Sequence, residues 1–430
     1  MKTLFWAFVE RFAPRAGTAL LMLAFAALST PATVGYYAAM MTGYAVLQAV
    51  TDGAAKRTAT TAVATEQGLL FLRRYRRWYA ALGTLFLLGV MWVVTLWGAA
   101  VSDVVTFLPL LLLPTIMGRT VVPLALLQRA GQWKRISMLS SASALAALCV
   151  GFPLVFAFHN ALGSVVQLVL TELLFAVGVH WASRTLRESC LVTSDPSARY
   201  WPHFASAGTF IISLQGQYQL DRVTVGAMAG PAALGSFNLG WALARTFTDS
   251  LSTSTLNVVQ ARVIDGQKKS ADAIRTIVMA ALPRALIMAS VIVVGVYVAA
   301  RFVAPLFLGE EWNDMLQVVP LMSVTGIPSI CCYCLLPPLL YFKRINWATA
   351  PRLLGLVLSL AIGWAVQYSL DAAVWIALFR EFLALAVMLV GAKVIVTKRM
   401  VLLPIGATAA ACLLISAADG LLFHLGLLAG

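Results

Sequence analysis

The chain has 430 residues, of which 61% are apolar and 11% are charged. Ordinary soluble domains carry roughly 25% charged residues, so this composition excludes a water-soluble fold. The 31 Lys and Arg residues against 17 Asp and Glu residues give a net charge of +14. In a soluble protein this excess would suggest a nucleic-acid partner, whereas in a membrane protein it is typical of basic cytosolic loops.

The apolar runs predict an all-α polytopic membrane protein made of two six-helix bundles. A bilayer core about 30 Å thick takes about 20 apolar residues per helix. A further apolar segment follows near 401–418, and the tail over 421–429 is too short to cross alone. The predicted spans lie near 13–30, 34–51, 78–101, 104–127, 137–158 and 161–183, and then near 203–228, 232–258, 284–308, 315–341, 352–370 and 372–396.

One long polar stretch, Ser183–Tyr200, lies midway along the chain and is the natural linker between the bundles. We therefore divide the chain into four parts. These are an N-terminal bundle over 1–183, a cytosolic linker over 184–202, a C-terminal bundle over 203–396 and extra hydrophobic segments over 397–430.

A short internal repeat supports two related halves. Thr30-Pro-Ala-Thr-Val-Gly-Tyr-Tyr37 aligns with Gly230-Pro-Ala-Ala-Leu-Gly-Ser-Phe237, and the two share Pro, Ala and Gly at an offset of 200 residues. Each copy falls between the first and second spans of its half. Since six crossings separate the copies, the halves are expected to be related by a pseudo-two-fold axis along the membrane normal. Two such bundles suit alternating access.

The basic residues predict the topology. With the N-terminus in the cytosol, 26 of the 31 Lys and Arg residues fall in cytosolic segments, Arg352 among them. The outer loops, including those around Asp103, Asn160, Glu310–Asp314 and Asp371, contain no Lys or Arg. This distribution follows the positive-inside rule. Topology therefore explains the net charge, and no nucleic-acid partner is expected.

Five arginines and four acids remain inside the predicted spans. Each would cost about 2.5–3.5 kcal/mol near the midplane if it faced lipid, so we expect these side chains to face a bundle interior or a wet cavity. Arg301 lies near the outer end of its span, and we expect it to snorkel to the surface. The arginines are Arg119, Arg222, Arg245, Arg301 and Arg380, and the acids are Glu172, Asp221, Asp249 and Glu381.

Two of these arginines are candidates for an anion site in a central cavity. Arg245 lies at the middle of its span, and Arg119 lies a little to the cytosolic side of the middle of its own. Asp249 follows Arg245 by four residues, so the two can pair along one helix face. The alternative interpretation is that these charges only form pairs that stabilise the bundle.

Other polar residues inside the spans are candidates for a cavity face or for ion coupling. Glu172 and Asp249 could bind a coupling proton or sodium ion, or could neutralise an arginine. Adjacent charges diverge around a helix, so Arg380 and Glu381 are each expected to find a partner on another helix, as are Asp221 and Arg222. The candidates for the cavity or coupling are Glu172, Asp249, Gln215, Gln219, Asp221 and Arg222.

Prolines interrupt the fourth predicted span of each half. Pro109, Pro114 and Pro123 lie in the first, and Pro328, Pro337 and Pro338 lie in the second. Broken helices at matching positions indicate moving or cavity-lining segments, although packing kinks are the alternative.

The chain contains no sequence signature of a cofactor or metal site. Cys331, Cys332 and Cys334 have no nearby His or second Cys pair, so they are interpreted as small core residues. No Gly-rich phosphate loop, nucleophile elbow or zinc helix occurs. We therefore expect no catalytic residue, no metal and no cofactor, with the coupling ion left open.

Three segments resemble a known family. Leu220–Gly235, followed by Trp241–Arg245, resembles the start of the second half in the polysaccharide-transporter branch of the multidrug/oligosaccharidyl-lipid/polysaccharide exporter superfamily. Pro305–Trp312 resembles the motif of that branch at the outer end of the ninth span. Thr30–Tyr36 resembles its Gly-Pro-Glu-x-x-Gly-x-Tyr turn, with a Thr in place of the first Gly and Ala32 in place of the acid.

The resemblance implies a flippase, not an enzyme. It would move a polyprenyl-diphosphate-linked oligosaccharide to the outer leaflet of the bacterial cytoplasmic (inner) membrane, for O-antigen, capsule or exopolysaccharide assembly. Its partners would be the lipid-linked saccharide, membrane lipids and a polysaccharide polymerase or export machinery. The resemblance also implies a cationic central cavity for the diphosphate, and Arg119 and Arg245 are the positions that would supply it. The planar fork of arginine fits a diphosphate.

Two other functions stay open on the sequence. A drug and cation antiporter of the same superfamily would have a carboxylate-rich cavity, whereas the acids here have possible arginine partners. A membrane-embedded polysaccharide polymerase or glycosyltransferase would be expected to carry a sizeable loop or domain outside the membrane. The longest predicted outer loop, Gly309–Asp314, has six residues, which disfavours an enzyme.

Overall fold

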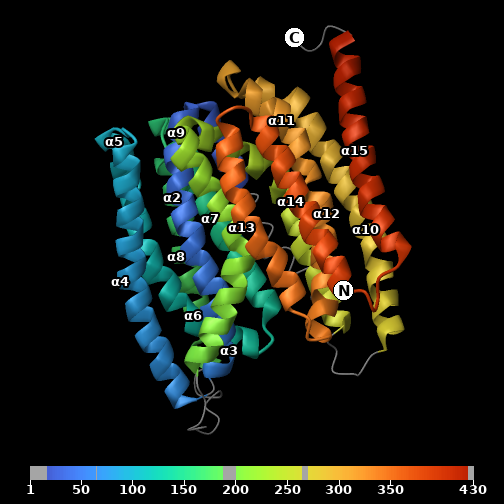
Figure 1. Ribbon diagram of the computed structural model, residues 1–430. Helices are drawn as coiled ribbons and strands as arrows, with labels where there is room; N and C mark the ends of the chain where they lie inside the picture. The colour runs from blue at the N-terminus through green and yellow to red at the C-terminus, as the bar shows by residue number, and fades with distance from the viewer. Residues whose placement is uncertain (1–16, 64, 187–199, 264–269, 425–430) are drawn as a thin grey trace. The chain divides into compact units, whose positions relative to one another are not determined.

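The computed structural model describes residues 17–63, 65–186, 200–263 and 270–424, which form helices joined by short turns (Figure 1). Within these ranges, nine helical segments are long and apolar enough to cross a membrane. The predicted all-α membrane fold is therefore confirmed. Several residues used in the topology prediction lie outside the described ranges, namely Lys2, Arg11, Arg15, Arg187, Arg199, Lys268 and Lys269, as does most of the predicted linker.

The chain forms two compact units, Met1–Gly235 (unit 1) and Ser236–Gly430 (unit 2). This division falls inside one long helix, α9 (Tyr200–Val263), whose N-terminal turns pack in unit 1. Tyr200 and Phe204 lie against a buried cluster that includes Ala59 and Leu72. The predicted bundle limits at 183 and 203 stay a prediction. The two compact units are defined by which residues pack together, whereas the predicted bundles were defined by the linker and the sequence repeat.

Unit 1 consists of helices that follow the predicted spans. Gly17–Ala27 and α2 (Pro31–Val50) match the first two spans. Short π and 3-10 segments cover Thr51–Ala55, Leu108–Leu112 and Arg184–Leu186. The remaining helices are α3 (Lys56–Ala62), α4 (Glu66–Leu96), α5 (Val101–Thr106), α6 (Leu113–Arg129), α7 (Trp133–Phe158), α8 (Leu162–Ala182) and the start of α9.

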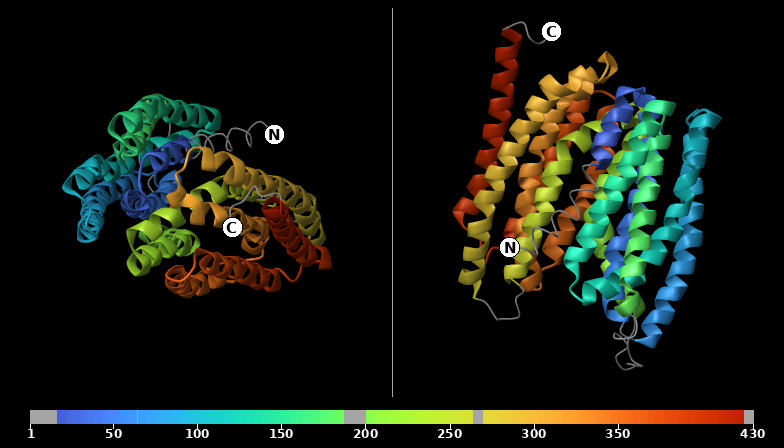
Figure 2. Two further views of the ribbon diagram at one scale, coloured as in Figure 1. Left: turned by 90° about the horizontal axis from the view of Figure 1, so that it is seen from above. Right: turned by 180° about the vertical axis from the view of Figure 1, so that it is seen from behind.

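Unit 2 begins in α9 and ends in a long C-terminal helix, α15 (Lys398–His424). This helix contains the further apolar segment predicted near 401–418. The long helices of the unit run side by side (Figure 2). They are α10 (Ala271–Val298), α11 (Asn313–Val324), α12 (Gly326–Tyr341), α13 (Asn346–Val366) and α14 (Leu370–Gly391), with short π and 3-10 segments at Ala299–Val303, Ala304–Leu306 and Glu310–Trp312.

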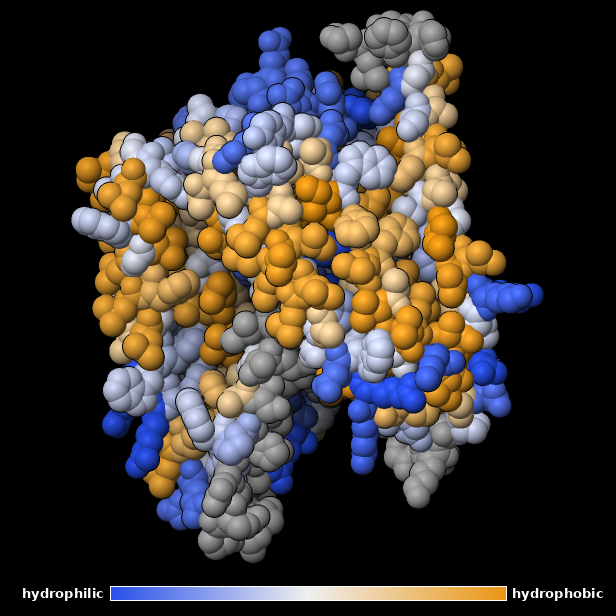
Figure 3. Space-filling model, in the orientation of Figure 1, coloured by the Kyte–Doolittle hydropathy of each residue, from blue (hydrophilic) through white to orange (hydrophobic). Residues whose placement is uncertain are grey.

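Apolar side chains cover the outward faces of the long helices. Leu85 of α4, Val291 of α10 and Leu413 of α15 are each more than 60% exposed. Figure 3 shows such side chains across the middle of the helices in view, with hydrophilic ones gathered towards the helix ends. An apolar surface of this extent suits lipid and not water.

The fourth predicted span of each half is interrupted, as the prolines predicted. In unit 1, α5 gives way to the 3-10 segment that contains Pro109, and α6 begins with Pro114 in its first turn. In unit 2, the helix breaks at Thr325 between α11 and α12, just before Pro328. Pro123, Pro337 and Pro338 lie inside continuous helix instead. These two segments are also the most enclosed candidate spans, with 72% and 89% of their apolar windows buried.

The two copies of the sequence repeat meet within unit 1. A Cβ atom placed on Gly35 would lie 1.8 Å from the Pro231 carbonyl oxygen, and one on Gly235 would lie 1.9 Å from the Pro31 carbonyl oxygen. Each glycine therefore lets the backbone of the other copy approach it, and no larger residue would fit without a shift. At the start of the second copy, Gly230 has φ +84°, which accounts for Gly where the first copy has Thr30.

Candidate functional site

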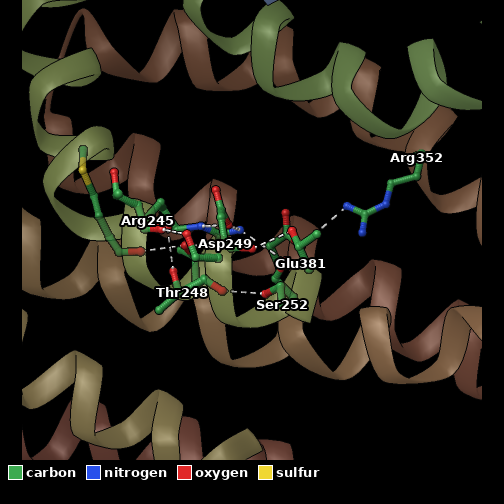
Figure 4. Close-up of polar contacts among 12 residues, drawn as sticks. Arg245, Thr248, Asp249, Ser252, Arg352 and Glu381 are labelled. Carbon is green, nitrogen blue, oxygen red and sulfur yellow. Dashed lines mark hydrogen bonds and ion pairs between the residues drawn. The ribbon is translucent and has the colours of Figure 1, made fainter. Parts of the chain in front are cut away.

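The best-defined polar cluster of unit 2 is built around Arg245 of α9 (Figure 4). Its Nε donates to Asp249 Oδ1 at 3.0 Å, and its Nη2 lies 2.7 Å from the same oxygen. The residues are four apart, so the predicted pairing along one helix face is confirmed. The Arg245 side chain is 3% exposed, whereas that of Asp249 is 41% exposed.

The guanidinium of Arg245 also reaches the broken helix of unit 2. Its Nη1 donates to Thr325 Oγ1 at 2.9 Å, and its Nη2 donates to Ser329 Oγ at 3.2 Å. Thr325 lies at the break between α11 and α12, and its hydroxyl donates to the Met322 carbonyl at 2.6 Å. The ring of Trp241 lies 5.4 Å from the guanidinium carbon, a distance suited to a cation–π contact. The cation is thus held by residues of its own helix, α9, and by residues at the break between α11 and α12.

Close packing keeps α9 against this break. A Cβ atom on Gly326 would lie 2.7 Å from Thr248 Cβ, so only glycine allows the two helices to approach so closely. The Thr248 hydroxyl donates to the Arg245 carbonyl at 3.2 Å, and Ser252 donates to the Thr248 carbonyl at 2.8 Å. Both bonds stay within α9, so at Thr248 the contact with α12 depends on shape complementarity.

Beside this cluster an ion pair joins α13 to α14 of unit 2, and Figure 4 draws its acid, Glu381, next to Asp249. Arg352 Nη1 is 3.7 Å from Glu381 Oε2, and the two side chains are 3% and 0% exposed. Arg380, 1% exposed, donates from Nη1 to the Ser359 hydroxyl at 3.3 Å. The expectation that Arg380 and Glu381 find partners on another helix is confirmed.

Arg352 is a correction to the sequence analysis, which placed it in a cytosolic segment. It lies inside α13 and is buried. Hydropathy placed the start of this span at 352, whereas α13 begins at Asn346. Arg352 stands at the start of an apolar run, where a span boundary is hard to locate. No signal in the count marked Arg352, because five arginines already stood against four acids inside the predicted spans.

Arg301 is a second correction. Instead of snorkelling, its side chain is 9% exposed and pairs with Asp419 of α15, with Nη2 to Oδ2 at 2.7 Å and Nε to Oδ1 at 3.0 Å. The Tyr297 hydroxyl donates to the same carboxylate at 2.9 Å. The partner was missed because Asp419 lies beyond the predicted apolar segment, so no cation was paired with it.

In unit 1, the structure separates Arg119 from the acids. Arg119 of α6 is exposed and forms no hydrogen bond or ion pair with another described residue. The neighbouring Gly118 packs on Arg76 of α4, with an added Cβ 3.3 Å from Arg76 Cγ. Arg119 therefore lies near the level of Arg76 of α4, in the later half of the segment Val101–Arg129, as the sequence indicated.

Glu172 has a defined partner in unit 1. The Tyr44 hydroxyl of α2 donates to Glu172 Oε1 of α8 at 2.9 Å, and the glutamate is half-buried. This contact joins two helices far apart in sequence.

The remaining candidates lie along the first half of α9. Arg222 Nη1 donates to Gln219 Oε1 at 3.2 Å within the same helix, and Asp221 is 1% exposed. The side chain of Gln215 lies outside the described residues. The predicted interhelical partners of Asp221 and Arg222 stay a prediction.

Comparison by sequence finds one family. The profile of a family described as "Polysaccharide biosynthesis protein" matches residues 25–317. No curated protein matches the chain.

Comparison by structure finds transporters of the MOP superfamily. The lipid II flippase MurJ in an inward closed conformation superposes with a TM-score of 0.70 at 10% identity, over 96% of this chain and 92% of that one. An inward-facing multidrug resistance transporter of the MATE family gives 0.66 at 12% identity, over 96% and 99%. A MOP transporter from Pyrococcus furiosus, described by the reverse polarity of its binding pocket, gives 0.57 at 15%, over 94% and 96%. At these identities the likeness establishes the fold.

Proposed function

This chain belongs to the family of polysaccharide biosynthesis proteins, and we propose from that premise that it is a flippase for lipid-linked oligosaccharides. Its substrate would be a polyprenyl-diphosphate-linked repeat unit, carried by alternating access for O-antigen, capsule or exopolysaccharide assembly. The family match carries this proposal, because a chain of long apolar helices in such a family is suited to translocation and not to catalysis. The saccharide would pass to a polymerase or export machinery on the outer side.

Arg245 and Arg119 are the proposed ligands for the diphosphate. Arginine binds phosphate oxygens bidentately, and its charge persists at every physiological pH. Arg245 is held in a fixed orientation by Thr325 and Ser329. Arg119 is exposed, so its guanidinium is accessible to a ligand. We further propose Glu172, beside Tyr44, as the group that takes up a coupling ion.

The function is tested by deleting the gene and complementing the strain with the intact chain. We expect the deletion strain to retain the lipid-linked saccharide on the cytosolic leaflet and to lose the corresponding surface polymer. Complementation should reverse both effects. An unchanged surface polymer together with new sensitivity to cationic drugs would contradict the proposal and favour the antiporter, whose fold this chain shares.

The proposed topology places the N-terminus in the cytosol and the protein in the cytoplasmic membrane of a bacterium. Single cysteines at positions Asp103, Asn160 and Glu311, in a background without the native six, should react with an impermeant thiol reagent once any outer membrane is permeabilised. Cysteines at Arg74 and Lys134 should not react, since basic loops stay inside. Labelling at position 134 but not at 103 would invert the topology.

A further inference from the structure

The two members of the Arg245–Asp249 pair differ in their access to solvent. The Arg245 side chain is 3% exposed, whereas 41% of the Asp249 side chain is exposed. Asp249 falls inside the span predicted near 232–258, where a carboxylate is costly against lipid, so we expect its exposed part to face a water-containing space. Any solute in that space meets Asp249 before it meets Arg245.

The guanidinium of Arg245 faces a carboxylate on one edge and two hydroxyl groups elsewhere. Its Nε and Nη2 both point at one oxygen of Asp249, and this edge is the one that arginine uses to bind phosphate oxygens in pairs. Its Nη1 and Nη2 also donate to the hydroxyls of Thr325 and Ser329, which carry no charge. The hydroxyls orient the cation, and the Asp249 carboxylate supplies a negative charge on the edge that would bind phosphate.

From this arrangement we infer that Asp249 is an internal counter-anion that occupies the phosphate-binding edge of Arg245 and gives way to the diphosphate of the substrate. This inference rests on the proposed function. Thr325 and Ser329 are positioning residues that keep the guanidinium in place during the exchange. Because Thr325 lies at the break between α11 and α12 and Ser329 lies in the first turn of α12, the same contacts connect occupancy of the site with that break.

The exchange has a direct consequence for affinity. A buried arginine without an anion is costly, so Asp249 stabilises the empty site and competes with the substrate. When the carboxylate is neutralised, binding no longer has to displace it. The charge of Asp249 also helps to expel the bound diphosphate, so its loss should slow release while it strengthens binding.

The test compares Asp249→Asn with the parent protein, purified in detergent or nanodiscs, using inorganic pyrophosphate and farnesyl diphosphate as probes. We expect Asp249→Asn to bind both probes about tenfold more tightly, since about 1.4 kcal/mol corresponds to a factor of ten. The flipping rate in cells should fall. A role limited to stabilising the fold cannot produce this gain, because it would lower the amount of folded protein and leave affinity unchanged or weaker.

Asp272→Asn is the matched control. Asp272 pairs with Arg275 three residues later at 2.6 Å, but its side chain is 81% exposed and lies outside the cluster. This variant should bind both probes as the parent does. The increase in probe affinity caused by Asp249→Asn should disappear in a background that carries Arg245→Ala. That result would show that the increase depends on this arginine.

Thr325→Val tests the positioning role. The substitution keeps the shape of the side chain but removes the acceptor for Arg245 Nη1. We expect probe affinity to fall several-fold in both the parent and the Asp249→Asn backgrounds. Unchanged affinity in both backgrounds would refute the positioning role.

Equal or weaker probe binding by folded Asp249→Asn would overturn the counter-anion inference. That result leaves the proposed function intact if the deletion strain still loses its surface polymer. Conversely, suppose that Asp249→Asn binds the probes more tightly but the deletion strain keeps its surface polymer. These two results would support an anion site and contradict the flippase function. Tighter binding of pyrophosphate but not of farnesyl diphosphate would contradict a lipid-linked ligand and point to a free phosphate anion.

Discussion

Unit 2 contains two ion pairs of the same chemistry in different settings. Arg245 and Asp249 are 2.7 Å apart, and the acid is 41% exposed. Arg352 and Glu381 are 3.7 Å apart, and both side chains are at most 3% exposed. The first pair lies along one helix with its acid open to water, whereas the second joins α13 to α14 and is closed. An open pair can exchange its anion, and a closed pair can only hold helices together.

The closed pair should give the largest effect on stability. Glu381→Ala would leave the buried Arg352 without its carboxylate, a change that typically costs about 3–5 kcal/mol. We expect a large loss of membrane-inserted protein and a lower unfolding temperature. The double variant Arg352→Ala/Glu381→Ala should recover much of the loss, and if it does not, the two residues do not act as a pair.

The open pair should respond differently. Arg245→Ala removes charge-assisted hydrogen bonds worth about 1.5–3 kcal/mol each, so diphosphate binding should weaken by roughly tenfold to a hundredfold. Arg245→Lys keeps the charge without the fork and should retain partial activity, and Arg245→Glu should abolish it.

Abundance and transport must be measured separately for this pair. Adding Asp249→Ala to Arg245→Ala should restore the amount of protein but not binding. If folded Arg245→Ala flips the saccharide at the parental rate, Arg245 is not part of the anion site.

Arg119 extends the comparison to a cation with no acid beside it among the described residues. Since it is exposed, Arg119→Ala should change stability by no more than about 0.5 kcal/mol. If Arg119 binds the diphosphate, affinity should nevertheless drop by about tenfold or more. Thermal unfolding and probe binding on one preparation separate the two quantities. A normal affinity would remove Arg119 from the proposed site.

The smallest effects concern the hydroxyl groups of the two clusters. Ser329 accepts from Arg245 at 3.2 Å, and Ser359 accepts from Arg380 at 3.3 Å. Removing either hydroxyl should cost about 1 kcal/mol of stability. Only Ser329→Ala should also lower diphosphate affinity, by a few-fold. If Ser359→Ala lowers affinity equally, the open and closed clusters do not differ in function.

Much of the fold could be predicted because its signals are local. The apolar runs gave helices close to the predicted spans, since the bilayer thickness sets their length. The prolines predicted interruptions of the two enclosed spans, because proline has no backbone N–H to donate to the preceding turn. Pro109, Pro114 and Pro328 lie at or next to the breaks, whereas Pro123, Pro337 and Pro338 are accommodated inside helices. The Arg245–Asp249 pair followed from a spacing of four residues.

The remaining features depend on which helices become neighbours. Thr325 and Ser329 lie 80 and 84 residues from Arg245, and Asp419 lies 118 residues from Arg301. No period or motif marks such partners, because a polar side chain in a membrane takes whichever neighbour packing supplies. The burial of Arg352 and the exposure of Arg119 were decided in the same way. The sequence determined that charges lie within the helices, and only the tertiary structure decided which are closed off and which face open space, since exposure depends on packing between helices and not on hydropathy along one of them.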